Sequence, residues 1–441
     1  MTKILRTAPA VIVAVELALL LVAGAATVAR FRVFAPIDER AHYAYVQEVA
    51  EHGRLPVLGR DLVSWQALAI DNGTYPRRTA ADNAATQGLK GQSYEAFQPP
   101  LYYLAAAPVF LVPNSYRAKL FALRWFDLAL VLVAAGLAAL LARAVFGERW
   151  LVPYSLALGV LAWPGVLVRA ITVSNAALEL PLAFAYLLAV FNAQTRRSAH
   201  WLVVAGPLLG LCLLTRVTLV FLAPLLLVPV LSLLRERRAA AVAAVAAPVV
   251  LLAPWLVSNV NRYHALTAAG LAKRIQAPLL DPGLPNYGLG DVPSRVNRLL
   301  WSMLPQEWLP EYGRPLLGIV LKALPLAFAA LAIVAAVRAR IWRDRAALLL
   351  AAPLPLALVL LVWILAGENW QSSFLIRYAS AAFVPFALFA ALAWRRARWR
   401  ETGLIAFSAV AAVVVAVSWL VLAGSYYFTN LGGSLGIHPY G

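Results

Sequence analysis

The segment Leu404–Ala423 reads LIAFSAVAAVVVAVSWLVLA and contains no charged residue. A run of about 20 apolar residues is long enough to cross the hydrocarbon core of a bilayer as one α-helix. Leu151–Val168, Ala239–Val257 and Ala346–Ala366 are similar uncharged runs. In the whole chain, 62% of the residues are hydrophobic and 13% are charged, whereas soluble domains have about 45–50% and about 25%. The sequence therefore predicts an all-α integral membrane protein.

The alternation of apolar and polar residues that marks a membrane β-barrel is absent from the sequence. Lipid offers no hydrogen-bond partners to the backbone, so a polytopic helical bundle is the expected solution. We expect one membrane domain over residues 1–441 that crosses the bilayer about eleven times. The expected spans are 8–29, 120–142, 150–168, 173–193, 201–214, 217–234, 239–258, 315–337, 346–366, 376–393 and 402–424.

Two of these segments allow a second interpretation. The first span follows Lys3 and Arg6, as the apolar part of a cleaved signal peptide also would, but its length favours a retained helix. The spans 201–214 and 217–234 are short and closely joined. They predict either a hairpin or one long broken helix, and the parity of the topology depends on that choice.

Basic residues gather between the predicted spans and give the chain a formal net charge of +18. Clusters fall at every second connection, on the side that Lys3 and Arg6 share. They are Arg143/Arg149, Arg196/Arg197, Arg235/Arg237/Arg238, Arg338/Arg340/Arg343/Arg345 and Arg395/Arg396/Arg398/Arg400. The positive-inside rule then predicts a cytoplasmic N-terminus and two long extracytoplasmic loops, 30–119 and 259–314. No separate basic domain exists that would bind nucleic acid.

Several common motifs are missing. There is no Walker loop, no dinucleotide-binding glycine fingerprint and no Gly-x-Ser-x-Gly elbow. The five histidines lack zinc-site spacing, and Cys212, the only cysteine, excludes an internal disulfide and a cysteine metal site. With such short cytoplasmic connections, these absences argue against nucleotide chemistry on the cytoplasmic side.

The first long loop contains two predicted short helices. Apolar and aromatic residues recur at helical spacing from Ile37 to Val49, between Asp38, a suitable N-cap, and Gly53, a suitable C′ residue. This pattern indicates an amphipathic helix at the membrane interface. The second helix follows Gln98–Pro100 and runs for about 13 residues, which is too short to span.

Acidic residues lie at the start of both short helices. Asp38 and His42 are four residues apart and share a helix face, so they are candidates for a general base or a metal site. Ordinary capping with an acidic first turn, to which Glu39 adds, is the alternative explanation. Glu95 and Gln98 precede a proline pair that keeps them extended. A helix start with surface polar groups is the alternative there.

Arginines and amides gather at the outer ends of later predicted spans. Arg216 and Arg377-Tyr378 stand at such ends, where a guanidinium is suited to hold a phosphate. Interfacial snorkelling is the alternative. Others at this level are Arg169, Asn175, Asn259 and Arg262. The set suits an anionic, lipid-linked substrate.

Four ionisable residues fall inside predicted spans, where they are costly and often functional. Arg124 and Asp127 are three residues apart and are expected to pair with each other. Glu16 and Glu179 have no evident partner in the sequence.

Seven short motifs follow one another along the chain. They are Pro36-Ile37-Asp38-Glu39-Arg40-Ala41-His42-Tyr43, Gly53-Arg54-Leu55-Pro56, Glu95-Ala96-Phe97-Gln98-Pro99-Pro100-Leu101-Tyr102-Tyr103, Val173-Ser174-Asn175-Ala176-Ala177-Leu178, Gly210-Leu211-Cys212-Leu213-Leu214-Thr215-Arg216, Pro254-Trp255-Leu256-Val257-Ser258-Asn259 and Arg377-Tyr378. As an ordered set they resemble the GT-C superfamily, membrane glycosyltransferases that use polyprenyl-phosphate sugars. The nearest branch looks like the protein O-mannosyltransferase and aminoarabinose-transferase type, with bacterial relatives of unassigned substrate.

The resemblance implies an acidic pair in the first outer loop that acts as catalytic base or metal ligand, and Asp38 and Glu39 match it. A divalent cation, Mg or Mn, is the implied cofactor, with Asp38 as a possible ligand. Basic residues that contact the lipid phosphate are implied at Arg216 and Arg377. The chain departs from the family where it has Arg216 in place of a frequent Lys and Ala176 in place of a frequent Asp. For the second carboxylate, Asp71, Asp82 and Glu95 compete.

The resulting hypothesis is a plasma-membrane glycosyltransferase with an extracytoplasmic active site. It would move a hexosyl or pentosyl group, with inversion, from a polyprenyl-phosphate donor to a hydroxyl of a glycan, lipid or protein. The expected site residues are Asp38 and Glu39 as catalytic groups and His42, Glu95, Gln98, Tyr102, Arg216, Asn259, Arg262, Arg377 and Tyr378 as binding groups.

Two other functions remain open from the sequence. A transporter or flippase for a lipid-linked glycan is suggested by Glu16, Asp127 and Glu179 as ion-coupling carboxylates. Internal repeats, which many transporters have, are not apparent. The third option is a non-catalytic subunit of an envelope-assembly pathway, against which the acidic pair argues.

Overall fold

The computed structural model describes residues 2–31, 33–34, 38–64, 66–67, 70, 93–268, 270–272, 314–367 and 379–423. Helices make up nearly all of the regular structure in these ranges, which confirms the predicted all-α class. The α-helices are α1 (Thr2–Arg30), α2 (Glu39–His52), α5 (Leu101–Leu111), α6 (Tyr116–Phe146), α7 (Leu151–Leu161), α8 (Pro164–Ile171), α9 (Ala176–Thr195), α10 (Ala199–Thr215), α11 (Ala223–Leu233), α12 (Arg238–Tyr263), α15 (Arg314–Ala339), α16 (Arg345–Ala351), α17 (Pro353–Gly367), α18 (Ser380–Arg396) and α19 (Glu401–Ala423). The 3-10 helices are η2 (Tyr94–Phe97), η3 (Gly147–Arg149), η4 (Val217–Leu222) and η9 (Ile341–Arg343).

Five helical segments of the described chain are long and apolar enough to cross a membrane. They are Thr7–Arg30, Tyr116–Arg149, Ala176–Thr195, Arg238–Tyr263 and Glu401–Ala423. Several apolar helices of 10–17 residues accompany them. The chain is therefore a multi-pass membrane protein, whereas the number of eleven spans stays a prediction.

The expected span 150–168 is not one continuous helix in the structure. It consists of α7 and α8, which meet at an angle of 65°. Pro164 stands at the start of α8, and proline has no N–H with which to continue the preceding helix. The Trp419 indole donates a hydrogen bond to the carbonyl of Ala162 at 2.7 Å, so α19 satisfies a backbone group that the break exposes.

The 201–234 segment is a hairpin. α10 ends at Thr215, and Arg216 is extended, with φ −158° and ψ 121°. The Arg197 guanidinium, which precedes α10, donates to the Ser232 carbonyl at 3.4 Å and to Glu236 at 2.5 Å, both near the end of α11. The start of α10 thus lies beside the end of α11. This is the arrangement of a hairpin, because in one long helix these two ends would lie far apart.

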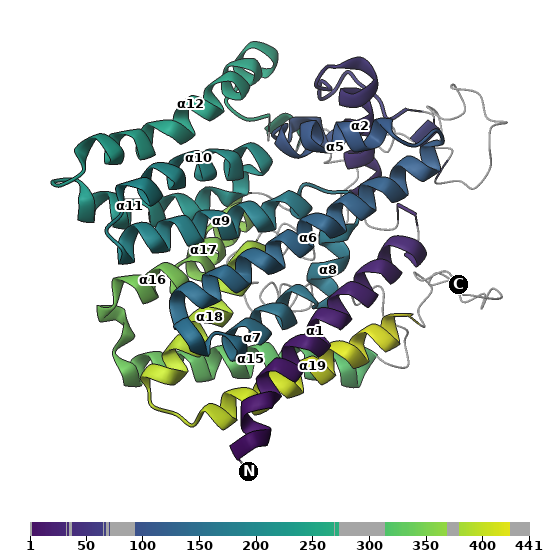
Figure 1. Ribbon diagram of the computed structural model, residues 1–441. Coiled ribbons are helices and arrows are strands. Elements are labelled where there is room, and N and C mark those ends of the chain that lie inside the picture. The colour runs from purple at the N-terminus through teal and green to yellow at the C-terminus, as the bar shows by residue number, and fades with distance from the viewer. Residues whose placement is uncertain are drawn as a thin grey trace.

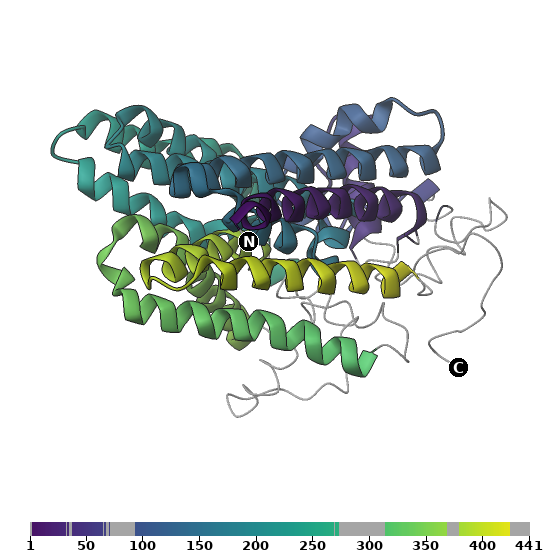
Figure 2. The ribbon, with the colours of Figure 1, turned by 60° about the horizontal axis from the view of Figure 1, so that its bottom comes forward.

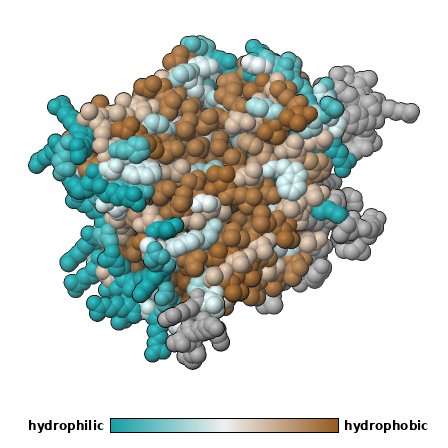
Figure 3. Space-filling view, in the orientation of Figure 1, coloured by the Kyte–Doolittle hydropathy of each residue, from teal (hydrophilic) through white to brown (hydrophobic). Residues whose placement is uncertain are grey.

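The helices run across the molecule in layers (Figures 1 and 2), with α1 packed against both α6 and α19, and α15 beyond α19. α2 and α5 form a small cap at one end (Figure 1). The arginine-rich turns lie at the opposite end, where contacts join Arg395 to Arg149 and Arg396 to Asp344. Figure 3 shows hydrophobic residues across the middle of one face and hydrophilic residues at the edge that carries the α11–α12 and α15–α16 turns. The positively charged turns therefore share one side, as the sequence predicts.

α10 and α12 approach each other closely because glycine lies at their contact. A Cβ atom on Gly206 would stand 2.3 Å from the carbonyl oxygen of Ala244. A Cβ atom on Gly210, one turn later, would stand 2.8 Å from a Leu251 methyl and 3.0 Å from Pro248 Cα. Small residues four positions apart allow such backbone proximity in membrane helices, where dispersion contacts replace the hydrophobic effect.

We predict that Gly206→Ala separates α10 from α12 and lowers stability, because the new methyl group meets backbone atoms that cannot move aside. The expected loss is about 1–3 kcal/mol, measured as a lower midpoint of thermal unfolding in detergent. Gly136→Ala is the matched control, because a Cβ atom there has no neighbour within 4 Å. Equal midpoints for the two variants would contradict the close packing.

Candidate functional site

The cap is built from the two short helices that the sequence predicts. α2 ends at Gly53 in the left-handed conformation, with φ 64°, and the Gly53 N–H caps the Val49 carbonyl. Asp38 occupies the N-cap position, but its side chain makes no capping hydrogen bond. α5 has 11 residues, too few to span a bilayer. Because the Asp38 side chain makes no capping hydrogen bond, helix capping does not explain the presence of an aspartate at this position.

Asp38, His42 and Glu95 form an acidic cluster. One ligand atom from each lies within 4.8 Å of the other two. Asp38 and His42 are one turn apart along the start of α2, as their spacing predicts, and Glu95 comes from η2. His42 and Glu95 are buried, whereas Asp38 is partly exposed. The geometry thus brings Glu95 to the first two residues, while Asp71 and Asp82 lie outside the described residues.

Tyr103 holds the imidazole of His42, and Tyr45 packs behind Tyr103. The Nδ1 atom of His42 lies 2.7 Å from the Tyr103 hydroxyl, and the two rings stack. Tyr45 stacks on Tyr103, and the centroids of these two rings are 3.6 Å apart. Burial, and then the neighbouring Glu95 carboxylate, raise the pKa of Tyr103 well above its ordinary value. Its hydroxyl thus stays protonated and fixes the orientation of the histidine ring.

Glu39, which the sequence suggests as a catalytic residue, is engaged in buried contacts. Its carboxylate forms two hydrogen bonds of 2.7 Å with Arg124 of α6, and both side chains are fully buried. It also accepts from the backbone N–H of Phe34 at 2.9 Å and of Val173 at 3.3 Å. With both oxygens engaged, Glu39 anchors α2 to α6. These contacts argue against Glu39 as the base, and its catalytic role stays a prediction.

The expected local pair of Arg124 and Asp127 is corrected. The guanidinium of Arg124 is directed to Glu39, and the Asp127 carboxylate accepts from the Tyr102 hydroxyl at 2.9 and 3.1 Å. Tyr102 is therefore a link between α5 and α6. Tyr102 is buried, and its role in substrate binding stays a prediction.

An amide pair ties the cap to the later helices. The Asn175 side chain, just before α9, donates to the Gln98 side-chain oxygen at 3.3 Å and to the Thr215 carbonyl at 3.2 Å. Thr215 is the last residue of α10, so this one amide joins three segments. Gln98 consequently lies between the acidic cluster and Arg216.

Arg216 and Glu179 form the second buried ion pair. A guanidinium nitrogen of Arg216 lies 2.6 Å from the Glu179 carboxylate, which also accepts from the Ser380 hydroxyl at 3.1 Å. The partner of Glu179, invisible in the sequence, is thus Arg216. Asn175 links Gln98, three residues after Glu95, to the Thr215 carbonyl directly before Arg216, so side-chain contacts connect the two regions. This brings together two parts of the predicted site.

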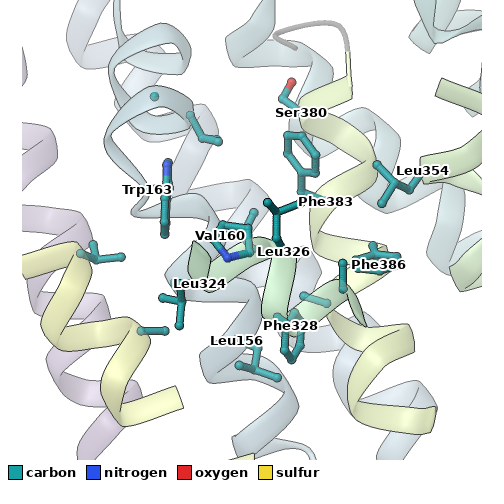
Figure 4. A pocket seen from close by; sticks show the side chains of 18 of the residues that line it. Leu156, Val160, Trp163, Leu324, Leu326, Phe328, Leu354, Ser380, Phe383 and Phe386 are labelled. Atoms are coloured by element: carbon teal, nitrogen blue, oxygen red, sulfur yellow. The ribbon is translucent and has the colours of Figure 1, made fainter. Parts of the chain in front are cut away.

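An apolar cavity of about 300 Å³ adjoins this ion pair. Figure 4 shows Ser380 at one end, Leu156 and Phe328 at the other, and Trp163 and Phe383 between them. Arg169 also lines the cavity. Because Ser380 donates to Glu179, the polar end of the cavity is continuous with the Arg216–Glu179 pair.

Of the remaining predicted binding residues, the two that the structure describes, Asn259 and Arg262, have other contacts or are exposed. Asn259 donates to the Leu266 carbonyl at 3.0 Å and thereby holds the turn after α12. Arg262 is exposed, one residue before Tyr263, whose hydroxyl accepts from the Leu58 N–H at 3.0 Å. Arg377 and Tyr378 lie outside the described residues.

The donor set of the acidic cluster fits a divalent metal ion. Two carboxylates and one imidazole are ligands that Mn²⁺ and Zn²⁺ accept, whereas Mg²⁺ prefers oxygen ligands alone. With a metal on Nε2, the Nδ1–H of His42 would donate to Tyr103, which is the usual outer-shell arrangement of a metal-bound histidine. The residues therefore fit the implied cofactor and favour manganese or zinc over magnesium.

Sequence reasoning missed two residues of the site. Tyr103 appears only as part of a motif, and nothing in its neighbourhood indicates that it reaches His42, 61 positions away. For Ser380, the only feature of the sequence that could have indicated a role in the site is its position three residues after Arg377.

We predict that Glu39→Gln strands the buried Arg124 charge and lowers stability by about 3–5 kcal/mol. Thermal unfolding of the purified protein in detergent measures this effect. Glu48→Gln, on the same helix, is the control, because the Glu48 side chain is 18% exposed and its ion pairs contribute about 0–1 kcal/mol. An unchanged midpoint for Glu39→Gln would favour Glu39 as a catalytic residue instead.

Neither a protein-family model nor a curated protein matches the chain. Among solved structures, it is similar to ArnT from Cupriavidus metallidurans bound to undecaprenyl phosphate, with 16% identity and a TM-score of 0.49, over 94% of this chain and 71% of that one. It is also similar to the Archaeoglobus fulgidus oligosaccharyltransferase in complex with Zn and sulfate, with 15% identity, a TM-score of 0.46 and 92% of this chain covered. The chain spans 52% of the length of that archaeal enzyme.

Proposed function

We propose that this protein is a GT-C-type glycosyltransferase that uses a polyprenyl-phosphate sugar as donor. The observation that supports the proposal is a set of polar side chains, linked through Asn175, near the end of an apolar cavity. The site contains a carboxylate cluster (Asp38, His42 and Glu95) and a buried arginine, Arg216. A donor of this class needs the same three environments, one each for the sugar, the phosphate and the isoprenoid chain.

The donor phosphate is the leaving group, and Arg216 is the candidate for holding it. In the reaction, the bond between the anomeric carbon and the phosphate oxygen breaks, and its electron pair stays with the phosphate. A preorganised guanidinium stabilises the charge that develops there. Glu179 and Ser380 keep the Arg216 side chain in position.

Asp38 is the candidate base. It is partly exposed at the start of α2, beside His42 and Glu95, so an incoming hydroxyl can reach its carboxylate. As the acceptor oxygen bonds to the anomeric carbon, its proton passes to Asp38. Partial proton transfer suffices, because the attacked carbon has oxocarbenium character. A single displacement of this kind inverts the anomeric configuration.

A divalent ion would be held by Asp38, His42 and Glu95, and when bound it would supply positive charge beside the reacting centre. A carboxylate has two oxygens, so ligation through one leaves Asp38 able to accept a proton through the other. His42 and Glu95 are thus binding groups rather than bases.

The site lies at the end opposite the arginine-rich turns. With those turns in the cytoplasm, as the positive-inside rule requires, the reaction takes place on the extracytoplasmic side of the plasma membrane. The acceptor is then a hydroxyl of an envelope glycan, lipid or exported protein.

The transporter alternative has less support than it had from the sequence. Of its three coupling carboxylates, Glu179 is paired with Arg216 and Asp127 accepts from Tyr102. Only Glu16 has both carboxylate oxygens buried without a hydrogen-bond partner among the described residues.

We predict that Asp38→Asn lowers the rate of sugar transfer by at least about 100-fold, since an amide cannot accept the proton. Transfer from a panel of labelled polyprenyl-phosphate sugars to membrane acceptors is the assay. Glu48→Gln, which removes a carboxylate elsewhere on α2, should keep nearly full activity. Full activity of Asp38→Asn would show that the base is assigned wrongly.

We also predict that the protein binds one Mn²⁺ or Zn²⁺ and that His42→Ala weakens binding by about 10–100-fold. Metal content after dialysis, measured by mass spectrometry, reports this without any activity assay. His52→Ala is the matched control, since His52 is exposed at the other end of α2. Equal metal content in the two variants would rule out the cluster as the metal site.

A further inference from the structure

The turn between α15 and α16 forms a basic hollow that the proposed reaction does not use. It measures about 590 Å³ and lies at the arginine-rich end of the molecule. Its lining includes four arginines, of which three come from this turn and one from the last turn of α18. They are Arg340, Arg343, Arg345 and Arg396. Asp344 is the single acidic residue of the lining.

The charge of this hollow is not neutralised by its own aspartate. Asp344 accepts from the backbone N–H groups of Ala346 and Ala347 and pairs with Arg396 at 3.0 Å. Arg340, Arg343 and Arg345 are exposed, and their side chains have no hydrogen-bond or ion-pair partner in the part of the chain that the structure describes. Three positive charges therefore converge on one concave surface.

The backbone conformation of the turn buries Ile341 and leaves the neighbouring arginines and Trp342 exposed. Arg340 has φ 48°, in the left-handed region that favours glycine, yet an arginine stands there. Ile341 is buried and holds the turn against the bundle, while the next residue, Trp342, is 51% exposed. An exposed tryptophan beside arginines is typical of a segment at the interface of lipid headgroups and acyl chains.

We propose that this hollow binds the headgroup of an anionic phospholipid. The lipid phosphate would accept hydrogen bonds from Arg340, Arg343 and Arg345, since a guanidinium matches phosphate geometry. Trp342 would lie among the acyl chains next to it. Basic pockets between membrane helices select anionic headgroups in this way. The site is independent of the glycosyltransferase proposal.

The test is native mass spectrometry of the full chain in detergent, titrated with phosphatidylglycerol and, separately, with phosphatidylcholine. The protein should retain phosphatidylglycerol more tightly. The triple variant Arg340→Gln/Arg343→Gln/Arg345→Gln should lose affinity by roughly fivefold for each arginine removed. The matched control is Arg235→Gln/Arg237→Gln/Arg238→Gln, which removes the same charge from the exposed turn between α11 and α12. It should bind as the unaltered protein does.

Trp342→Ala separates a lipid from a free phosphate as the occupant. It should weaken phosphatidylglycerol binding and leave any binding of inorganic phosphate unchanged. Equal losses in the two triple variants would mean that net charge alone attracts the lipid, and would overturn the site. Equal retention of the two lipids, or inorganic phosphate that binds as tightly as phosphatidylglycerol, would overturn it as well. Thermal unfolding of each variant checks that it is folded.

Discussion

The arrangement of the cap depends on the buried ion pair of Glu39 and Arg124. Both side chains are fully buried, and each charge would be stranded without the other. Glu39 follows Asp38 directly and lies one turn from His42, so the pair fixes both residues of the acidic cluster relative to α6. The same two side chains bind the backbone of Phe31 and Val173. One interaction therefore holds the end of α1, the start of α2, α6 and the segment before α9 together.

A second set of contacts extends this anchoring toward the cavity. Asn175 joins Gln98 to the end of α10, and α10 ends directly before Arg216. The position of Arg216 is therefore coupled to the cap through a side-chain amide, and to α18 through Glu179 and Ser380. Behind it, α10 is held closely against α12 by Gly206. Packing within the bilayer and polar contacts at its edge together set the distance between the acidic cluster and the phosphate-binding candidate.

Local features of the fold and site could be predicted from the sequence, and long-range partners could not. The ends of α2 and the shared face of Asp38 and His42 follow from spacing within one helix, which the sequence shows directly. Arg124 was expected to pair with Asp127, three residues away, but it pairs with Glu39, 85 positions away. Glu179 forms an ion pair with Arg216, which is 37 positions away in the sequence. Such choices are made by tertiary packing, because a buried charge takes the partner that the folded bundle brings to it.

Besides the ligand chemistry, the charges of the proposed site favour the binding of a divalent cation. The proposed site places two carboxylates, Asp38 and Glu95, in one cluster, while Arg216 is paired with Glu179. In the proposed site, the carboxylates of the cluster would repel a donor phosphate at Arg216. A divalent cation on the cluster would reduce that repulsion. In the proposed site, binding of the metal and of the lipid phosphate would then favour each other, and by linkage such a coupling is reciprocal.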